Sequence, residues 1–490
     1  MCVERQYSSS RYNFAIPVKA GFLLYNSASG KVFEILGRDG GQLIRELAGH
    51  PQLVSTHDLD PRLITQLREG GFLVDPSEDE VAPIRKRFFN AIAGTPVVLT
   101  LTTTMDCNLG CYYCYEERSP DKLKVTHVEQ VVQLARNLLT TSGRDSLHVD
   151  WYGGEPLMNL EFLEHASGSL QALCQELWIS YSASVISNGT CWPSDIAGFV
   201  RRNRIRQVQI SFDGLKANHD KRRKYRKEHA SQSHASSFDV AVRLVDELVR
   251  YVRVDLRFNV DRGNQVDVIP FLQFARERGW FAESNQAVFQ PARLSSYSDR
   301  SAFMRKLELS LEEYEQIRSR VRREAATIVV VEEAEVPDKF PYPRSSVCAA
   351  LAADSVVVGA DAKLYRCGLQ VGETRRSVGT LELLASPLLP ILGQTVDRDG
   401  SEERWWKSFD PTTLPTCSRC SFLPVCWGGC PKKHLEGDGH ALWEQGEYWR
   451  RNLARLVVEG VGKTCDPSFA FSESDQFREI EQGLSATQPT

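Results

Sequence analysis

Between residues 96 and 325, short runs of β-branched and apolar residues alternate with amphipathic stretches such as 128–139 and 238–249. The runs are Val97–Thr104, Leu147–Tyr152, Ala183–Ser187, Gln207–Phe212, Val252–Val260 and Ala287–Gln290. Six β/α units at this spacing predict an α/β fold with a parallel sheet, either doubly wound or a partial barrel. In both folds the chemistry lies on loops at the carboxyl ends of the strands.

The first 90 residues are predicted to form a small separate module. Two β-like runs, Phe22–Tyr25 and Lys31–Ile35, flank a Ser/Gly turn, and a helical stretch follows at Gly41–Ala48. Asp60 then opens a second helix as its N-cap, with proline at the next position. This order of hairpin, helices and a final strand favours a winged-helix-like unit, followed by an acidic linker.

The pattern changes again after residue 325. Residues 326–472 are rich in loops and hold seven of the thirteen cysteines, whereas the polar residues 473–490 are predicted to be a disordered tail. We therefore predict four regions, 1–90, 96–325, 326–472 and 473–490.

Composition excludes several classes of protein. Of the 490 residues, 42% are hydrophobic, which excludes a disordered or fibrous chain, and the net charge of −4 gives no drive toward nucleic acid or anionic lipid. No run of 18 apolar residues occurs, so no membrane association is expected, and the first residues lack a secretory signal. We expect a cytoplasmic protein, in which clustered thiols are metal or redox ligands rather than disulfides.

The first cysteine cluster follows the strand that ends at Thr104. Cys107, Cys111 and Cys114 have the spacing C-x3-C-x2-C. Three thiolates on a [4Fe–4S] cluster leave one iron open for an external ligand. The alternative is a zinc site completed by a distant fourth ligand.

With three further motifs, this region resembles the radical S-adenosylmethionine (SAM) enzymes. The motifs follow successive predicted strands and are Gly153–Pro156, Ser187–Thr190 and Ser211–Gly214. The resemblance implies a partial (β/α)6 TIM-like barrel, in which the three cysteines hold the cluster that cleaves SAM to a 5′-deoxyadenosyl radical. It also implies SAM contacts from Tyr113, Gly153, Gly154, Glu155, Ser187, Asn188, Ser211, Asp213 and Arg223, with Arg223 suited to the SAM carboxylate.

The C-terminal cysteines form a second dense set. On spacing alone, Cys417, Cys420, Cys426 and Cys430 are compatible with a zinc ribbon. After a radical SAM core, however, they resemble the SPASM extension, which carries two auxiliary [4Fe–4S] clusters. The family pattern then assigns Cys348, Cys367 and Cys430 to a nearer cluster, and Cys417, Cys420, Cys426 and Cys465 to an outer one.

Seven thiolates leave one position of these two clusters without a cysteine. The nearer cluster would keep an open iron or take another ligand such as Asp354. The sequence also departs from the family pattern at Ala362, which stands where that pattern has a glycine before Cys367. Alanine adopts the backbone conformation of such a turn less easily than glycine does.

The resemblance implies an oxidoreductase that matures a ribosomally made peptide or protein. Its partners would be a precursor peptide and an electron donor such as flavodoxin or ferredoxin, with the first 90 residues as a leader-binding module. An anaerobic sulfatase-maturase-like activity is an alternative, but Gly368 stands where those enzymes carry an aspartate base. A second alternative is a non-catalytic binding protein that uses metal only for folding. The motifs name neither the catalytic base nor the bond that is formed.

Overall fold

The structure is a computed structural model that describes residues 6–36, 40–48, 51–57, 59–230, 236–296, 299–326, 340–384, 401–466 and 468–477. The chain divides into two compact units, each assembled from separate segments. The first unit contains residues 1–94, 335–348 and 408–490, and the second contains residues 95–334 and 349–407.

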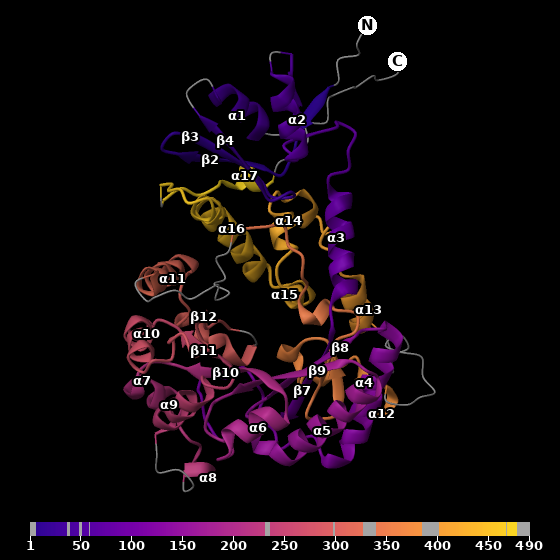
Figure 1. The fold of residues 1–490 in the computed structure, drawn as a ribbon, viewed down its shortest axis with the longest axis vertical. Coiled ribbons are helices and arrows are strands. Elements are labelled where there is room, and N and C mark those ends of the chain that lie inside the picture. The colour runs from indigo at the N-terminus through magenta and orange to yellow at the C-terminus, as the bar shows by residue number, and fades with distance from the viewer. Residues whose placement is uncertain are drawn as a thin grey trace. The chain divides into compact units, whose positions relative to one another are not determined.

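The second unit is built on one open sheet in which six parallel strands follow each other in chain order (Figure 1). The strands are β7 (Val97–Thr104), β8 (Ser146–Gly153), β9 (Ser180–Ser187), β10 (Ile205–Phe212), β11 (Arg253–Val260) and β12 (Ala287–Arg293). Each pairs in parallel with the next, and β7 and β12 do not pair with each other. The predicted partial barrel is therefore confirmed, and all six predicted strands are present.

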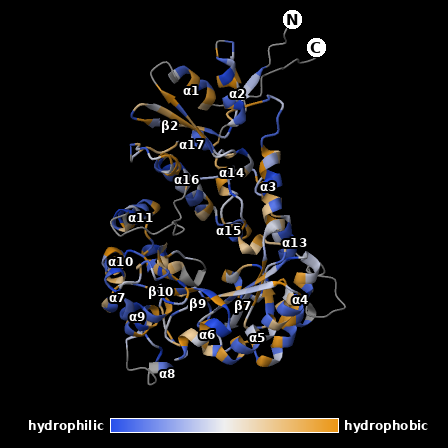
Figure 2. Cartoon of the chain, viewed as in Figure 1, coloured by the Kyte–Doolittle hydropathy of each residue, from blue (hydrophilic) through white to orange (hydrophobic). Residues whose placement is uncertain are grey.

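Amphipathic helices cover the outer face of this sheet. They are α4 (Val128–Ser142), α5 (Leu160–Glu176), α6 (Ile196–Arg202), α7 (Lys216–Arg222), α9 (Ser237–Leu248), α10 (Val268–Glu277) and α11 (Leu311–Ala326), while the single-turn helix α8 (Lys227–Ala230) follows α7 in the chain. Apolar and polar segments alternate along α4 and α5 in Figure 2. Side chains of β8 alternate strictly between buried and partly exposed, and the buried Leu147, Val149 and Trp151 join the helices in the core of this unit. The other face of the sheet carries the polar members of that alternation, His148, Asp150 and Tyr152.

Three later strands extend the sheet beyond β7. β13 (Val356–Val358) pairs with β7 in parallel, and β14 (Lys363–Tyr365) and β15 (Gly379–Thr380) continue it in antiparallel pairs. Ala362, in the turn that precedes β14, has φ +58°, so the position does require the left-handed backbone that glycine adopts easily. The short helices α12 (Leu381–Leu384) and α13 (Ser401–Ser408) complete this part.

The first unit begins with two small sheets. One contains β1 (Tyr7–Ser9), β5 (Leu53–Val54) and β6 (Leu73–Val74), and the other is an antiparallel sheet of β2 (Asn13–Val18), β3 (Gly21–Asn26) and β4 (Lys31–Leu36). Helices α1 (Gly40–Ala48), α2 (Pro61–Glu69) and α3 (Val81–Gly94) complete the segment. Asp60 caps α2 as predicted, because its side chain accepts a hydrogen bond from the Arg62 N–H.

The β2–β3–β4 sheet has an apolar core on each face. On one face Leu24 and Ile35 pack against residues of α1 and α2. On the other face Phe14, Ile16, Leu23 and Tyr25 pack against the C-terminal segment, which contains α14 (Leu423–Cys426), α15 (Pro431–Glu436) and α16 (Gly439–Gly460). Phe14 stacks on Phe422 with ring centroids 5.0 Å apart. The N-terminal module and the cysteine-rich segment therefore share one core.

Part of the predicted disordered tail is ordered. Residues 473–476 form α17 (Glu473–Gln476), which Ser472 caps, and Phe477 pairs with Cys420 through the backbone. The Gln476 side chain finds partners on the cysteine-rich segment, in Arg450 and Cys420. Residues 478–490 lie outside the described part. No helix of the described part is long and apolar enough to cross a membrane.

Candidate functional site

The loop that carries Cys107, Cys111 and Cys114 leaves the carboxyl end of β7. Backbone hydrogen bonds attach it to the segment after α7, from the Gly110 N–H to the Lys224 carbonyl (2.7 Å) and from the Arg226 N–H to the Asn108 carbonyl (2.9 Å). The Arg226 side chain also donates to the Cys107 carbonyl at 3.1 Å. The part of the loop from Asn108 to Gly110 is thus fixed by a second element.

Gly153 and Gly154 end β8 directly against the start of this loop. A Cβ on Gly154 would lie 2.4 Å from the Asp106 carbonyl oxygen, and one on Gly153, whose φ is +129°, would lie 2.3 Å from that of Thr104. The N–H groups of Gly154 and Glu155 donate to these same two carbonyls at 3.0 Å. The glycines are therefore needed for close contact between two strand ends, a reason that the motif alone did not reveal.

Glu155 joins the ends of β8 and β9. Its fully buried carboxylate accepts hydrogen bonds from the Ser187 hydroxyl (2.9 Å) and from the Asn188 N–H (2.7 Å). Burial raises the pKa of Glu155 to about 7, and these donors oppose the rise. Asn188 in turn reaches the cysteine loop, donating to Asn108 at 2.8 Å and to the Cys107 sulfur at 3.6 Å.

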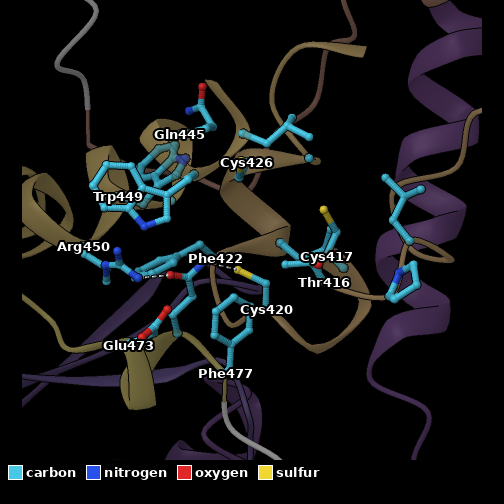
Figure 3. A pocket seen from close by; sticks show the side chains of 18 of the residues that line it. Thr416, Cys417, Cys420, Phe422, Cys426, Gln445, Trp449, Arg450, Glu473 and Phe477 are labelled. Carbon is cyan, nitrogen blue, oxygen red and sulfur yellow. Dashed lines mark hydrogen bonds between the residues drawn. The ribbon is translucent and has the colours of Figure 1, made fainter. Parts of the chain in front are cut away.

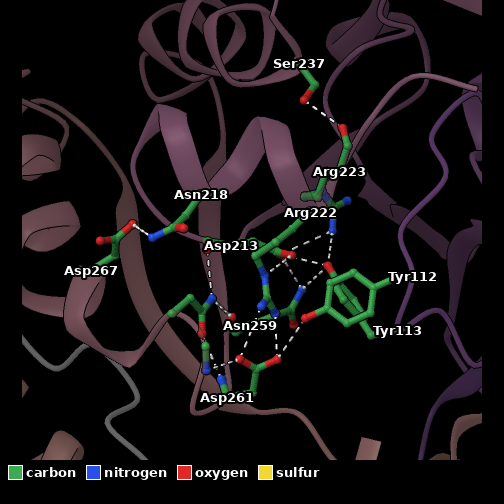
Figure 4. A network of polar contacts seen from close by, with 12 residues as sticks. Tyr112, Tyr113, Asp213, Asn218, Arg222, Arg223, Ser237, Asn259, Asp261 and Asp267 are labelled. Carbon is green, nitrogen blue, oxygen red and sulfur yellow. Dashed lines mark hydrogen bonds and ion pairs between the residues drawn. The ribbon is translucent and has the colours of Figure 1, made fainter. Parts of the chain in front are cut away.

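Asp213, at the end of β10, is the centre of a buried polar network (Figure 4). The Tyr113 hydroxyl donates to its carboxylate at 2.7 Å, and Arg223 donates to that hydroxyl at 2.7 Å. Asp213 is also paired with Arg222 at 3.2 Å. Three of the predicted SAM-binding residues, Tyr113, Asp213 and Arg223, are thus brought into direct contact.

Sequence reasoning missed the outer half of this network. Asp261, directly after β11, accepts two hydrogen bonds from Arg222 at 2.8 and 3.2 Å, and the Arg222 guanidinium lies over the rings of Tyr112 and Tyr113. Asn264 donates to the backbone carbonyl of Asp213 at 2.8 Å. The signal was available, because Asp261 follows its strand as Asp213 follows β10. The remaining predicted residue, Ser211, lies on β10 opposite Arg257 of β11.

The loop suits a ligand that carries both iron and a carboxylate. Burial raises the pKa of Cys107, Cys111 and Cys114, so these thiols need a cation to become thiolates. The buried Nε of Arg223 has no hydrogen-bond partner among the described residues, while Cys107 and Cys111 are close enough to act on Arg223 electrostatically. An unpaired guanidinium N–H near two of the three thiols fits an iron–sulfur cluster with an anionic partner.

A second set of cysteines lines a cavity of about 510 Å³ in the first unit (Figure 3). Cys417, Cys420 and Cys426 contribute to its wall, together with the aromatic residues Trp443 and Trp449. Since one water occupies about 30 Å³ in the liquid, the cavity accommodates a group of several atoms. Burial raises the pKa of Cys417 and of Cys420 to about 12.

Backbone N–H groups point at the sulfur atoms of this set. The N–H groups of Gly428 and Gly429 donate to Cys426, in a stretch where Trp427, Gly428 and Gly429 all have φ between +50° and +76°. The N–H of Phe422 donates to Cys420. Donors aimed at sulfur stabilise thiolates, so these residues fit an iron–sulfur cluster.

Other predicted ligands are not brought to this cavity. Cys465, after α16, is not among the residues that line it, although it packs against the same core as Cys420 and Cys426. Cys348 and Cys430 belong to the first unit and Cys367 to the second. Asp354 lies 3.6 Å from Arg144 in an ion pair. Among the described residues, no three His, Cys, Asp or Glu side chains are arranged to hold one metal ion.

Comparisons with known proteins agree with this geometry. Residues 101–255 match the family model described as the radical SAM superfamily. A probable GTP 3′,8-cyclase of Methanocella arvoryzae is 30% identical over 117 residues, which are 24% of this chain and 34% of that protein. The chain thus matches about a third of the length of this curated relative.

Two solved structures resemble the chain at low sequence identity. The anaerobic sulfatase-maturating enzyme anSMEcpe, with bound AdoMet and a Cp18Cys peptide, has a TM-score of 0.53 and 18% identity over 75% of this chain and 99% of its own. Streptococcus suis SuiB bound to its precursor peptide SuiA has a TM-score of 0.44 and 14% identity over 86% and 95%.

The family match covers the second half of β7 and all of β8 to β10, together with the cysteine loop and the three motifs that follow them. The first of the two solved structures shares the fold over three quarters of the chain. Residues 101–255 of this protein are therefore a radical SAM domain.

Proposed function

We propose that the protein is a radical SAM enzyme that modifies a ribosomally made peptide or protein. The observation that carries the proposal is the convergence of the ends of β7, β8, β9 and β10 on one cysteine loop. One residue at each strand end fixes the loop or the side chain of Tyr113. These residues are Thr104, Gly154, Asn188 and Asp213. At these strand ends three thiols lie on the same loop as Tyr113, whose hydroxyl contacts the buried Arg223.

In this proposal each residue of the loop and its neighbours has one task. Cys107, Cys111 and Cys114 hold the cluster, Arg223 binds the SAM carboxylate through its free Nε, and Asp213 keeps Tyr113 in place. A cluster held there would supply the one electron that breaks a C–S bond of SAM, giving methionine and a carbon radical that would remove a hydrogen atom from the substrate. The other predicted SAM contacts lie at the ends of the same strands and shape the site there. They are Gly153, Gly154, Glu155, Ser187, Asn188 and Ser211.

The cavity of Figure 3 is proposed to hold the outer auxiliary cluster on Cys417, Cys420 and Cys426. Cys465 is its proposed fourth ligand, and Cys348, Cys367 and Cys430 are the proposed ligands of the nearer cluster. Both would exchange electrons with a donor such as flavodoxin or ferredoxin, in the cytoplasm.

A peptide substrate is supported by the likeness to anSMEcpe, whose structure contains AdoMet and a peptide. The N-terminal module supplies an edge for a leader peptide, since β4 pairs only with β3 among the described strands. Leu36, at the end of β4, is 64% exposed. An extended peptide can add to such an edge as a further strand.

The sulfatase-maturase-like alternative lacks its base. A Cβ on Gly368 would lie 3.8 Å from the ring of Tyr152, so a side chain would fit at this position, but the chain has none. We therefore do not assign formylglycine formation to this protein.

Anaerobic iron and sulfide analysis, combined with detection of 5′-deoxyadenosine, tests the radical SAM assignment. We expect about twelve irons per chain, as three clusters of four, and SAM cleavage with dithionite. Replacing Cys107, Cys111 and Cys114 together by Ala should abolish the cleavage and remove about four irons. Zinc in place of iron, without visible cluster absorbance, would refute the assignment.

Co-expression with a small open reading frame beside the gene, followed by mass spectrometry of the peptide, tests the substrate class. Leu36→Asp should weaken peptide binding and leave SAM cleavage without peptide unchanged. Leu53→Asp, on the exposed part of β5 in the other sheet, is the matched control. Equal affinities of the two variants would remove the leader-binding role from β4.

A further inference from the structure

The C-terminal end of the described chain lies against the cavity of Figure 3. The Ser421 N–H donates to the Gln476 carbonyl at 2.8 Å, and Phe477 pairs with Cys420. Ser472 caps α17 through the Asp475 N–H, and Asp475 bonds back to the Ser472 N–H. These two backbone contacts hold the segment next to Cys420, a predicted cluster ligand. The segment itself carries no cysteine.

The side chain of Gln476 donates a hydrogen bond to the Cys420 sulfur, with Nε2 and Sγ 3.7 Å apart. Gln476 is 7% exposed, so its side chain is shielded from bulk solvent. Its other end is fixed as well, because the buried Arg450 donates to Oε1 at 2.6 Å. Since Arg450 requires the oxygen, the amide must present its N–H2 group to the sulfur. Glu447 is the ion-pair partner of Arg450, which completes the chain of contacts.

Gly446 supplies an independent sign that this position is built for the amide. It lies in the interior of α16, where glycine costs about 1 kcal/mol relative to alanine. A Cβ at this position would lie 3.0 Å from Gln476 Nε2 and 3.4 Å from Oε1. The helix therefore leaves room for the side chain of Gln476 at a cost to its own stability.

We propose that Gln476 is a positioning residue that sets the reduction potential of the outer cluster through its hydrogen bond to Cys420. The inference rests on the proposed function, because it requires a cluster on Cys417, Cys420 and Cys426. A hydrogen bond to a ligating sulfur stabilises the more negative, reduced state, and so raises the potential. Arg450 acts through Gln476 by fixing the orientation of the amide.

The test is a redox titration, followed by electron paramagnetic resonance, of the full chain with Cys107, Cys111 and Cys114 replaced by Ala. This background removes the SAM cluster, and the nearer auxiliary cluster serves as an internal reference. Gln476→Met keeps the length of the side chain and removes its donors. The matched control is Gln445→Met, which changes another glutamine of the cavity wall.

We expect Gln476→Met to keep the iron of the outer cluster and to lower its potential. The expected shift is about tenfold in the reduction equilibrium, which is about 59 mV for one electron. Gln445→Met should leave the potential unchanged. Gly446→Ala keeps the amide but displaces it, and should shift the potential in the same direction as Gln476→Met.

An unchanged potential in Gln476→Met, with iron content equal to wild type, would overturn the inference. If Gln476→Met loses the iron of the outer cluster, Gly446→Ala becomes the deciding variant. An unchanged potential of the outer cluster in Gly446→Ala would also overturn the inference. A purely structural role predicts lost iron and no change in the potential of the clusters that remain. Iron analysis of the wild-type chain comes first, and absence of the outer cluster there would refute the proposed function instead.

Discussion

At the scale of single residues, His219 is a buried group that the proposed chemistry does not use. It is fully buried on α7 between the rings of Phe212 and Phe238, each about 5.5 Å away between centroids. Neither ring nitrogen has a hydrogen-bond partner among the described residues. Burial lowers the pKa of His219 to about 3, and Arg223 adds to this effect. The imidazole is therefore neutral in the folded protein.

His219→Phe should make stability less dependent on pH. The unfolded chain binds a proton at this histidine below about pH 6.5, whereas the folded chain does not until about pH 3. The free energy of unfolding therefore falls as the pH drops through this window, by about 2 kcal/mol between pH 7 and 5. The variant should not show this decrease in the free energy of unfolding. Urea unfolding followed by tryptophan fluorescence at each pH measures it. Parallel pH profiles of variant and wild type would contradict it.

Ala362→Gly should stabilise the second unit. An alanine in the left-handed region costs about 1 kcal/mol that glycine does not, partly offset by the freedom of glycine in the unfolded chain. We expect a gain of about 0.5–1 kcal/mol in unfolding free energy, seen as a higher melting temperature. Ala360→Gly, at a buried position without the left-handed backbone, should destabilise instead. If Ala362→Gly and Ala360→Gly both lowered the stability, the backbone at Ala362 would not be strained.

The residues of the site divide into those that a local pattern reveals and those that it does not. Tyr113, Asp213 and Arg223 lie within or beside recognisable motifs, so they could be predicted. Arg222 and Asp261 contact the motif residues only after β10 and β11 are side by side. Their pairing is a product of strand order, which a reading of one segment at a time does not give.

At the scale of elements, the contact between β8 and the cysteine loop should tolerate no side chain at Gly154. Gly154→Ala would place a Cβ against the Asp106 and Met105 carbonyl oxygens at 2.4 and 2.9 Å. The loop must then move, so we expect at least a tenfold loss of 5′-deoxyadenosine formation, because about 1.4 kcal/mol of misplacement suffices for that factor. Iron content measured in parallel separates cluster loss from SAM misplacement.

Gly168→Ala is the control for this change. Gly168 lies in α5 with no atom within 4 Å of the added Cβ, so that variant should keep full SAM cleavage. Wild-type cleavage in Gly154→Ala would show that the strand ends do not fix the loop.

Elements with one strong local signal could be predicted, and the others could not. β7 has its predicted bounds, Val97–Thr104, because eight β-branched or apolar residues follow one another there. β2 was not predicted, since Pro17 interrupts its sequence, and β1 and β5 are too short for a pattern to form. These strands exist because partners elsewhere in the chain complete their sheets.

At the scale of the whole molecule, the shared core of the first unit links the N-terminal module to the outer cluster. Phe14→Ala should destabilise this unit by about 3–5 kcal/mol and lower the iron bound by Cys417, Cys420 and Cys426. The reason is the contact of Phe14 with Phe422 and Phe471, both at 5.0 Å between ring centroids. Iron analysis and urea unfolding measure the two effects.

Phe33→Ala is the matched control, because Phe33 packs on the opposite face of the same sheet, against Phe72. It should destabilise the module and have a smaller effect on iron. Equal iron loss in the two variants would contradict a specific link. Deletion of the first 85 residues is a poor test of leader binding, since it would expose the core that holds the cysteine-rich segment.

The division of the chain into units was the part least open to sequence reasoning. Motif spacing separates residues 1–90 from 326–472, whereas the structure packs segments of both into one unit. Hydrophobic faces at Phe14 and Leu453 are visible as apolar positions, but nothing local shows that they meet.

This shared core has a consequence for synthesis on the ribosome. The Ser27 hydroxyl donates to the Ser421 carbonyl across 394 residues of sequence. At a translation rate of about 5–20 residues per second, roughly 20–80 s pass between synthesis of β2 and β3 and synthesis of the segment that covers their apolar face. The radical SAM domain has time to fold in that interval, while the nascent module exposes Phe14 and Ile16. Expression should therefore respond to chaperone supply and to growth temperature more strongly than the size of the chain suggests.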